Sequence, residues 1–266
     1  MKLTLLCDNN TFIDQYLLGE PAFSCYLEID EARILLDTGY SDVFLKNAET
    51  LGIDLSRLTH VVLSHGHDDH TGGLAPLTQR HDLSGTQLVC HPRCLLKRWY
   101  GETYIGPPDD IIPHFGSHIQ SGDPVWLTEH CVFLGQIPTL HDFEPRYSIG
   151  EVLADGQREP DLLTDDSALV CKTPDGLFIL TGCSHSGICN IVTHAQAVCG
   201  EDRIAGILGG FHLMEANPRA EKTADFLHRI APAVLYPCHC VSLAAKILLA
   251  RKLDIREAGS GLYLEA

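Results

Sequence analysis

Three histidines and two aspartates lie between positions 65 and 70, within the segment SHGHDDHTGG. In an extended chain, side chains two positions apart point the same way, so His65 and His67 can bind one cation together. Asp69 and His70 follow after the chain turns, and they can bind a second cation. The segment therefore predicts a metal centre, with a solvated polar loop as the alternative.

The histidine segment follows a short apolar run, HVVLS at residues 60–64, which is typical of a buried strand. Polar side chains at the end of a buried strand cost free energy unless a partner satisfies them, and a metal ion is such a partner. Glycines at positions 66, 72 and 73 permit the close backbone approach that a ligand loop needs. Both features favour the metal centre over the polar loop.

Strand and helix patterns surround this segment in both halves of the chain. In the first half we expect helices after Ser41, ending at Gly52, and after Pro92, and strands at 2–7, 24–29, 33–37, 60–64 and 86–91. In the second half we expect helices at 188–199, 218–230 and 243–253, and strands at 124–128, 131–135, 168–173, 176–182, 204–210, 234–237, 254–258 and 261–266.

The two halves resemble each other. EARILLDTGYSDVFLKNA (31–48) and DGLFILTGCSHSGICNIV (175–192) share a hairpin turn, an apolar strand, Thr-Gly, a short polar segment and a helix. In each half a second apolar strand follows and ends in a turn with glycine and histidine. This pattern predicts an internal repeat whose loops meet at one edge, and a coincidence of common patterns is the alternative.

Two stretches, 101–123 and 141–166, are rich in glycine, proline and polar residues. We expect one domain over residues 1–266, with loop-rich insertions in these stretches. Long loops of this kind are often lids or binding loops, and a surface insertion is the alternative.

Composition limits the partners. The 266 residues carry a formal charge of -16, which repels nucleic acid and anionic lipid alike, and no apolar run is long enough to span a membrane. The N-terminal residues lack the hydrophobic region of a signal peptide, and the eleven cysteines follow no regular framework. We expect a cytoplasmic protein that acts on a small molecule, which can be anionic or phosphorylated.

The motif His65-x-His67-x-Asp69-His70, preceded by LLDTG and HVVLS, resembles the signature of the metallo-beta-lactamase fold superfamily. The resemblance implies a four-layer αββα sandwich of two related halves, with one or two metal ions at the shared edge. NAETLGIDLSRLTHVVLSHGHDDHTGGL, LTGCSHSGI, ILGGFHL and YPCHC together resemble the 7,8-dihydropterin-6-methyl-4-(beta-D-ribofuranosyl)aminobenzene-5'-phosphate synthase-like subgroup. Its members are mostly recorded only as metal-dependent hydrolases.

The resemblance implies two ligand sets for two divalent cations, zinc first, with iron or manganese also compatible with the ligands. One set comprises His65, His67 and His185, and the other comprises Asp69, His70 and His239. Many superfamily members have a bridging aspartate where this chain has Cys183. Either Cys183 is a thiolate ligand, or it is a small core residue and His185 supplies the bond; we favour His185, because soft thiolates tend to belong to closed structural sites.

Other residues are expected around the centre. His212 in GGFHL could bind substrate, act as a general acid or complete the metal shell, with a structural histidine as the alternative. Asp37 is expected to hold an imidazole of the histidine loop, and Asp166 is a weaker candidate for lining the site. His239 is expected on an extended strand, where the side chains of Cys238 and Cys240 point away from it, so both cysteines are expected to pack away from the metal.

Residues 71–73 are expected to begin a helix whose free N–H groups hold an anionic substrate group. Asp68 is expected to face solvent or a partner of a ligand.

The implied activity is that of a metal-dependent hydrolase. Two cations would activate a bridging hydroxide against an ester, lactone, phosphoester or amide bond, and Asp69 would orient the water or receive its proton. The alternatives are a synthase or transferase on a phosphorylated pterin-type substrate, and a metal- or ligand-binding regulatory protein without turnover.

Overall fold

Two large sheets carry the fold. The computed structural model describes all residues from 1 to 266. The first sheet has the order β17 (Tyr263–Glu265), β1 (Lys2–Cys7), β2 (Ser24–Ile29), β3 (Ala32–Leu36), β4 (His60–Val62), β5 (Gln87–Cys90) and β8 (Ser117–Gln120). The second has the order β16 (Leu235–Pro237), β15 (Ile204–Gly209), β14 (Gly176–Thr181), β13 (Ala168–Thr173), β10 (Cys131–Phe133) and β9 (Val125–Trp126).

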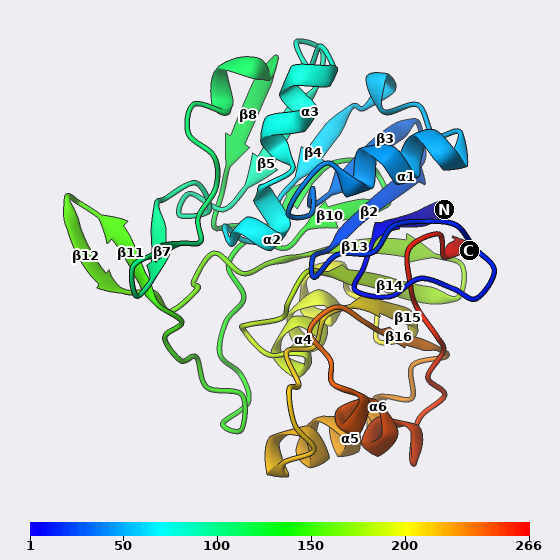
Figure 1. The fold of residues 1–266 in the computed structure, drawn as a ribbon. Coiled ribbons are helices and arrows are strands. Elements are labelled where there is room, and N and C mark those ends of the chain that lie inside the picture. Colours follow the sequence, from blue (N-terminus) through cyan, green and yellow to red (C-terminus); the bar gives the residue numbers. More distant parts are fainter.

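A third, smaller sheet projects from one side of the molecule (Figure 1). Its order is β12 (Gln157–Pro160), β11 (Glu151–Ala154), β6 (Arg98–Tyr100) and β7 (Thr103–Tyr104). These strands come from the stretches expected to be loops and from the segment after Pro92.

Helices cover the outer faces of the two large sheets, which gives the predicted four-layer αββα sandwich (Figure 1). On one side lie α1 (Val43–Leu51) and α3 (Leu74–Arg80), and on the other α4 (Ile188–Cys199), α5 (Pro218–Ile230) and α6 (Leu243–Ala250). The short helices are α2 (Asp68–Thr71), η1 (Leu55–Arg57) and η2 (Ile112–His114). None of the helices is long and apolar enough to cross a membrane.

The period-two pattern of the strands builds the layers. In β3, Ile34 and Leu36 belong to the core between the sheets, whereas Leu35 faces the α1 and α3 layer. In β14, Phe178 lies in the core between the sheets and Ile179 faces the α4 layer. Strands buried on both faces need apolar residues at every position, so these segments are continuous apolar runs in the sequence.

Parallel pairing places the ends of several strands together. β3, β4 and β5 are parallel neighbours in the first sheet, as are β14, β15 and β16 in the second. Carboxyl ends of parallel strands lie at one edge of a sheet, where ligands commonly bind. The histidine segment follows β4, the segment with Cys183 and His185 follows β14, and His239 follows β16.

The helix expected after Pro92 is wrong. Residues 92–96 form turns, and the chain enters β6 with Arg98 fully buried. The tertiary partners of Arg98 override the local helix pattern. Smaller differences are that α6 ends at Ala250 rather than at 253, and that 254–258 makes only an isolated bridge through Ile255.

Candidate metal centre

The first ligand cluster consists of His65, His67 and His185, all buried. His65 and His67 come from the loop after β4, and His185 comes from the loop after β14. His65 Nε2 lies 3.1 Å from His67 Nδ1, and the three ligand atoms all lie within 4.8 Å of one another. The i, i+2 spacing expected from the sequence therefore brings two imidazoles together, and the second half of the chain contributes the third.

The protonation states of this cluster suit a cation. Burial, with the neighbouring imidazoles, holds the pKa of His65 and His185 well below the usual value, and burial lowers the pKa of His67 to about 4. Neutral imidazoles present free lone pairs at pH 7. His67 Nε2 and both ring nitrogens of His185 are buried without a hydrogen-bond partner. Because such atoms normally have a partner, this cluster fits a bound metal ion.

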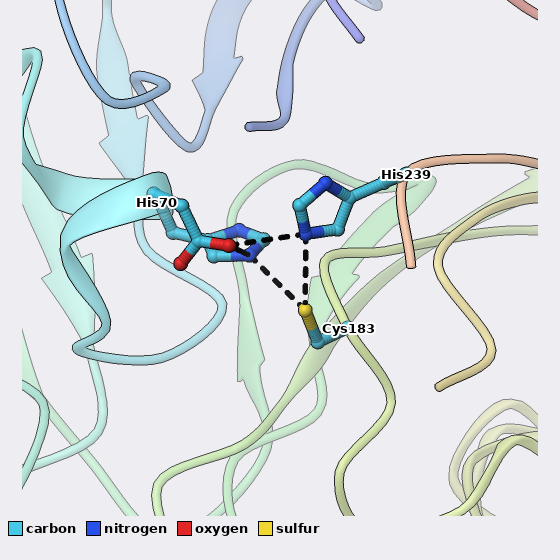
Figure 2. Close-up of side chains that lie close together, drawn as sticks. His70, Cys183 and His239 are labelled. Carbon is cyan, nitrogen blue, oxygen red and sulfur yellow. Dashed lines mark hydrogen bonds and ion pairs between the residues drawn. The ribbon is translucent and has the colours of Figure 1, made fainter. Parts of the chain in front are cut away.

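The second cluster consists of Asp69, His70, Cys183 and His239. Figure 2 shows the side chains of His70, Cys183 and His239 pointing toward one another. Cys183 Sγ lies 3.2 Å from Nε2 of both His70 and His239, and Asp69 Oδ2 lies 3.2 Å from His239 Nε2. Carboxylate, imidazole and thiolate are all zinc ligands, so this donor set also fits a divalent cation.

Charge distinguishes the second cluster from the first. Burial opposes the charged form of Asp69, but His70 and His239 outweigh it and hold the pKa of the carboxyl well below its usual value. Burial likewise opposes the charged form of His70, but Asp69 and Asp37 raise its pKa to about 9. Burial raises the pKa of the Cys183 thiol well above its usual value. A thiolate at this position therefore requires a neighbouring cation.

The two alternatives for Cys183 and His185 do not exclude each other in the structure. Each residue lies in its own cluster, His185 with the first and Cys183 with the second. The sequence favoured His185 and treated Cys183 as a core residue. The expectation was incomplete, because Cys183 and His185, two positions apart in the loop after β14, face the two neighbouring clusters.

Asp37 holds the second cluster in place, as the sequence predicted. His70 Nδ1 donates to Asp37 Oδ2 at 2.7 Å, and the backbone N–H and hydroxyl of Ser64 donate to the same carboxylate, each at 2.7 Å. The carboxylate thereby fixes the ring orientation of His70 and leaves Nε2 toward Cys183. Asp37 has φ 57°, a conformation that aspartate and asparagine tolerate better than most residues.

The Asp37→Asn variant should bind metal at the second cluster about 10- to 100-fold more weakly, the usual effect of losing such a partner. Asparagine keeps the size and the backbone conformation but removes the negative charge that orients His70. Competition with a chromogenic chelator measures the affinity. Asp42→Asn, at the exposed aspartate that precedes α1 and pairs with Lys46, is the matched control. Equal affinity in Asp37→Asn and the parent would remove Asp37 from this role.

A buried ion-pair network that the sequence did not reveal supports the first cluster. Arg98 Nε pairs with Asp161 Oδ2 at 2.7 Å and Arg98 Nη2 with Asp165 Oδ2 at 2.8 Å, and all three side chains are buried. The same Asp165 oxygen accepts the backbone N–H of Gly66 at 2.9 Å. A Cβ at Gly66 would lie 1.7 Å from Arg98 Nη1, so only glycine fits between the two ligand histidines.

Arg98→Met should destabilise the protein by about 3–5 kcal/mol, because it leaves Asp161 and Asp165 buried without a counter-charge. Urea unfolding of the metal-free chain measures the loss. Arg80→Met, which breaks the exposed Arg80–Glu49 pair, is the matched control and should change stability by no more than about 1 kcal/mol. Similar unfolding midpoints for the two variants would contradict this account.

His212 lies beside the first cluster, as its position in the second-half turn predicted. Its ring centre is 4.4 Å from that of His185, and its Nδ1 lies 2.5 Å from the hydroxyl of Tyr147. Burial lowers the pKa of His212 to about 4. The contact with Tyr147, in the 141–166 insertion, has no signal in the sequence.

The two aspartates outside the ligand set have different surroundings. Asp166 is buried, accepts the backbone N–H of Ser186 at 2.8 Å and has a pKa raised to about 6 by burial. It supports the loop that carries His185. Asp68 is half-buried at the start of α2 and lines a cavity beside the cluster.

The anion site expected at the N–H groups of residues 71–73 is wrong. Thr71 donates to the carbonyl of His67, Gly72 to that of Asp68 and Gly73 to that of Gly39. A helix does begin after these residues, since Gly73 is the N-cap of α3, but the N–H groups of residues 71–73 are already used within the backbone.

The extended strand expected around His239 is also wrong. β16 ends at Pro237, and His239 has φ 52° with its N–H bound to Asp8 Oδ1 at 2.8 Å. Cys238 packs in the core between the sheets, as predicted, but Cys240 Sγ lies 3.5 Å from the carbonyl oxygen of Cys183. Cys240 is therefore a neighbour of the second cluster.

An open cavity of about 460 Å³ lies beside both clusters. His67, Asp68 and Asp69 form its polar wall, and the remaining lining residues are Pro21, Tyr40, Tyr100, Thr103, Ile105 and Ile149. This volume suits a small molecule, and the mixed lining is typical of a ligand site. Ile105 and Ile149 come from the two insertions, which fits the interpretation of both insertions as binding loops. A larger cavity of about 600 Å³ near β1 and β17 contains none of the cluster residues.

The fold and the two clusters define a class. The sequence profile of the Metallo-beta-lactamase superfamily matches residues 19–86. The chain is 30% identical to the 7,8-dihydropterin-6-methyl-4-(beta-D-ribofuranosyl)-aminobenzene-5'-phosphate synthase of Methanocaldococcus jannaschii, over 92% of this chain and 89% of the relative. The chain belongs to the metallo-beta-lactamase superfamily.

Two further comparisons agree with this assignment. An uncharacterized protein of Methanocaldococcus jannaschii is 28% identical over 91% of each chain. A crystal structure of a metal-dependent hydrolase of the beta-lactamase superfamily superposes with a TM-score of 0.86 and 32% identity, covering 100% of this chain and 99% of the other. The similarity thus extends far beyond the residues matched by the superfamily profile.

Proposed function

We propose that the protein is a metal-dependent hydrolase acting on a small molecule with an ester, lactone, phosphoester or amide bond. The observation that carries this proposal is the pair of ligand clusters side by side at the wall of an open cavity. The relative of 32% identity described as a metal-dependent hydrolase supports it.

The proposed ligands divide between two cations, with zinc as the metal we favour and iron or manganese compatible with the same donors. His65, His67 and His185 would hold one, and Asp69, His70 and His239, with Cys183, would hold the other. Divalent cations at such sites polarise a carbonyl or phosphoryl oxygen and make water more acidic.

Asp69 is proposed to orient the attacking water and to receive its proton. Its side chain is 28% exposed, whereas that of His70 is fully buried, and it lines the cavity. It is therefore the carboxylate of the ligand set that a substrate in the cavity can reach. Ligand and proton acceptor are compatible roles for a carboxylate with two oxygens.

His212 is proposed to donate a hydrogen bond to the substrate. Its low pKa keeps the ring neutral at pH 7, and the Tyr147 hydroxyl lies at Nδ1. If the hydroxyl donates there, the ring proton belongs on Nε2, which makes that nitrogen a donor. A neutral donor next to His185 can stabilise negative charge that develops on a substrate oxygen.

A specific observation favours a second function, that of a synthase or transferase on a phosphorylated pterin-type substrate. The relative of 30% identity carries the name of such a synthase and covers nearly the whole chain. A third candidate function is that of a metal- or ligand-binding regulatory protein. Such a protein would use the same pocket for binding and would catalyse no reaction.

Turnover by the metal-loaded protein separates these functions. Hydrolysis of members of a panel of esters, lactones, phosphoesters and amides, absent in His67→Ala, is the expected result. Product analysis with a phosphorylated pterin distinguishes condensation from hydrolysis. Bound metal without turnover on either panel would favour the regulatory reading.

We further propose that residues 1–266 act as one domain in the cytoplasm. All eleven cysteines are free and buried, which suits a reducing compartment.

A further inference from the structure

A second cavity lies on the His185 side of the metal centre. Its volume is about 250 Å³, and it lies at the N-terminal end of α5. Its lining residues are Tyr147, His212, Leu213, Met214, Glu215, Asn217 and Arg219. Nothing in the proposed hydrolysis uses this cavity beyond the ring of His212.

Arg219 is the unusual member of this lining. Its Nε is buried and has no hydrogen-bond partner, and the side chain takes part in no ion pair. The carbon at the centre of its guanidinium lies 5.8 Å from the ring centre of Tyr147. Arg219 is partly exposed and lines the cavity, so its guanidinium is a cation without a counter-charge that an anion in the cavity can reach.

The cavity is linked to the metal centre through two side chains. Arg219 lies against Tyr147, the Tyr147 hydroxyl lies 2.5 Å from His212 Nδ1, and His212 packs 4.4 Å from His185. The single side chain of His212 therefore separates this cavity from His185.

The charge of the chain favours an anion as that group. A formal charge of -16 repels anionic molecules in general, so an anionic substrate needs a local cation for recognition. Guanidinium matches phosphate and carboxylate with two parallel hydrogen bonds. The N-terminal end of the 13-residue helix α5 adds a favourable dipole. Glu215 also lines the cavity and is exposed, and its charge opposes an anion there.

We propose that this cavity is a subsite for an anionic substituent of the substrate, a phosphate or carboxylate group, held by Arg219. The inference deepens the proposed function, because it assumes that the metals and Arg219 bind one substrate. It replaces residues 71–73, whose N–H groups are occupied, as the place of anion recognition.

Calorimetric titration of inorganic phosphate into the metal-loaded protein tests the subsite without any turnover. Arg219→Gln should raise the dissociation constant about tenfold or more, as expected for lost charge-assisted hydrogen bonds, with metal content unchanged by elemental analysis. Arg219→Lys should recover part of the affinity, and Glu215→Gln should lower the dissociation constant below that of the parent. Equal phosphate affinity in the parent and Arg219→Gln, or no binding by the parent, would overturn the proposal.

A matched pair of esters then identifies the group. The pair differs only in a phosphate, or in a second pair a carboxylate, remote from the scissile bond. The parent should favour the anionic ester in KM, and Arg219→Gln should bring the two KM values together. If neither ester is hydrolysed, the hydrolase proposal fails, and the phosphate titration still decides the subsite.

Discussion

Alanine in place of His65 or His185 should abolish binding of the cation at the first cluster and reduce turnover by about 10³-fold or more. A metal ion contributes several kcal/mol to stabilising charge in the transition state, and each 1.36 kcal/mol is a factor of ten in rate. The two residues come from different halves of the chain, and their ring centres lie 4.7 Å apart. Equal losses in both variants would establish that the two halves build one site.

Elemental analysis of protein purified without added metal, together with steady-state rates, provides the measurement. The parent should carry two equivalents and each variant fewer. His228→Ala, on the exposed surface at the end of α5, is the control and should match the parent in both respects. A parent without bound metal, or variants that retain both equivalents, would contradict the proposed metal centre.

Serine in place of Cys183 should remove the metal from the second cluster and leave the first occupied. The thiol lies 3.2 Å from both His70 Nε2 and His239 Nε2, and its burial favours the neutral form unless a cation is bound. With Co²⁺ in place of the native metal, a sulfur ligand gives a thiolate-to-metal absorption band in the near ultraviolet. That band should be present in the parent and absent in Cys183→Ser.

Cys240→Ser is the matched control, because Cys240 is also buried and its Sγ contacts the carbonyl oxygen of Cys183. It should keep the band and both equivalents of cobalt. If the band persists in Cys183→Ser, another sulfur is the ligand. If the parent lacks it, Cys183 is a packing residue, as the sequence had favoured.

Local signals in the sequence determined most of the elements. The helix at 188–199 ends at Gly200 in the left-handed conformation, and the helix at 218–230 begins at Asn217, whose side chain accepts from Ala220 N–H. Caps of this kind act within a few residues, so helix ends can be predicted from the sequence without knowledge of the fold. The same holds for the candidate ligands His65 and His67, whose common direction follows from their spacing.

Contacts between distant parts of the chain could not be predicted from such local signals. The turn that replaces the helix expected after Pro92 depends on Arg98 reaching Asp161 and Asp165, which lie more than sixty residues away along the sequence. The two insertions were expected to be loops, whereas in the structure they contain short strands. These strands pair only with each other and with β5 or β6. Such strands have too few residues for a recognisable alternation.

The sequence alone determined the superfamily, the sandwich, the histidine motif and the supporting role of Asp37. The tertiary structure decided which donors lie close enough to share a cation: it placed Cys183 beside His70, 113 positions away, and gave His239 a left-handed backbone that brings it to the same point. Spacing fixes the direction of neighbouring side chains, whereas the meeting of loops from two sheets depends on how the whole core packs.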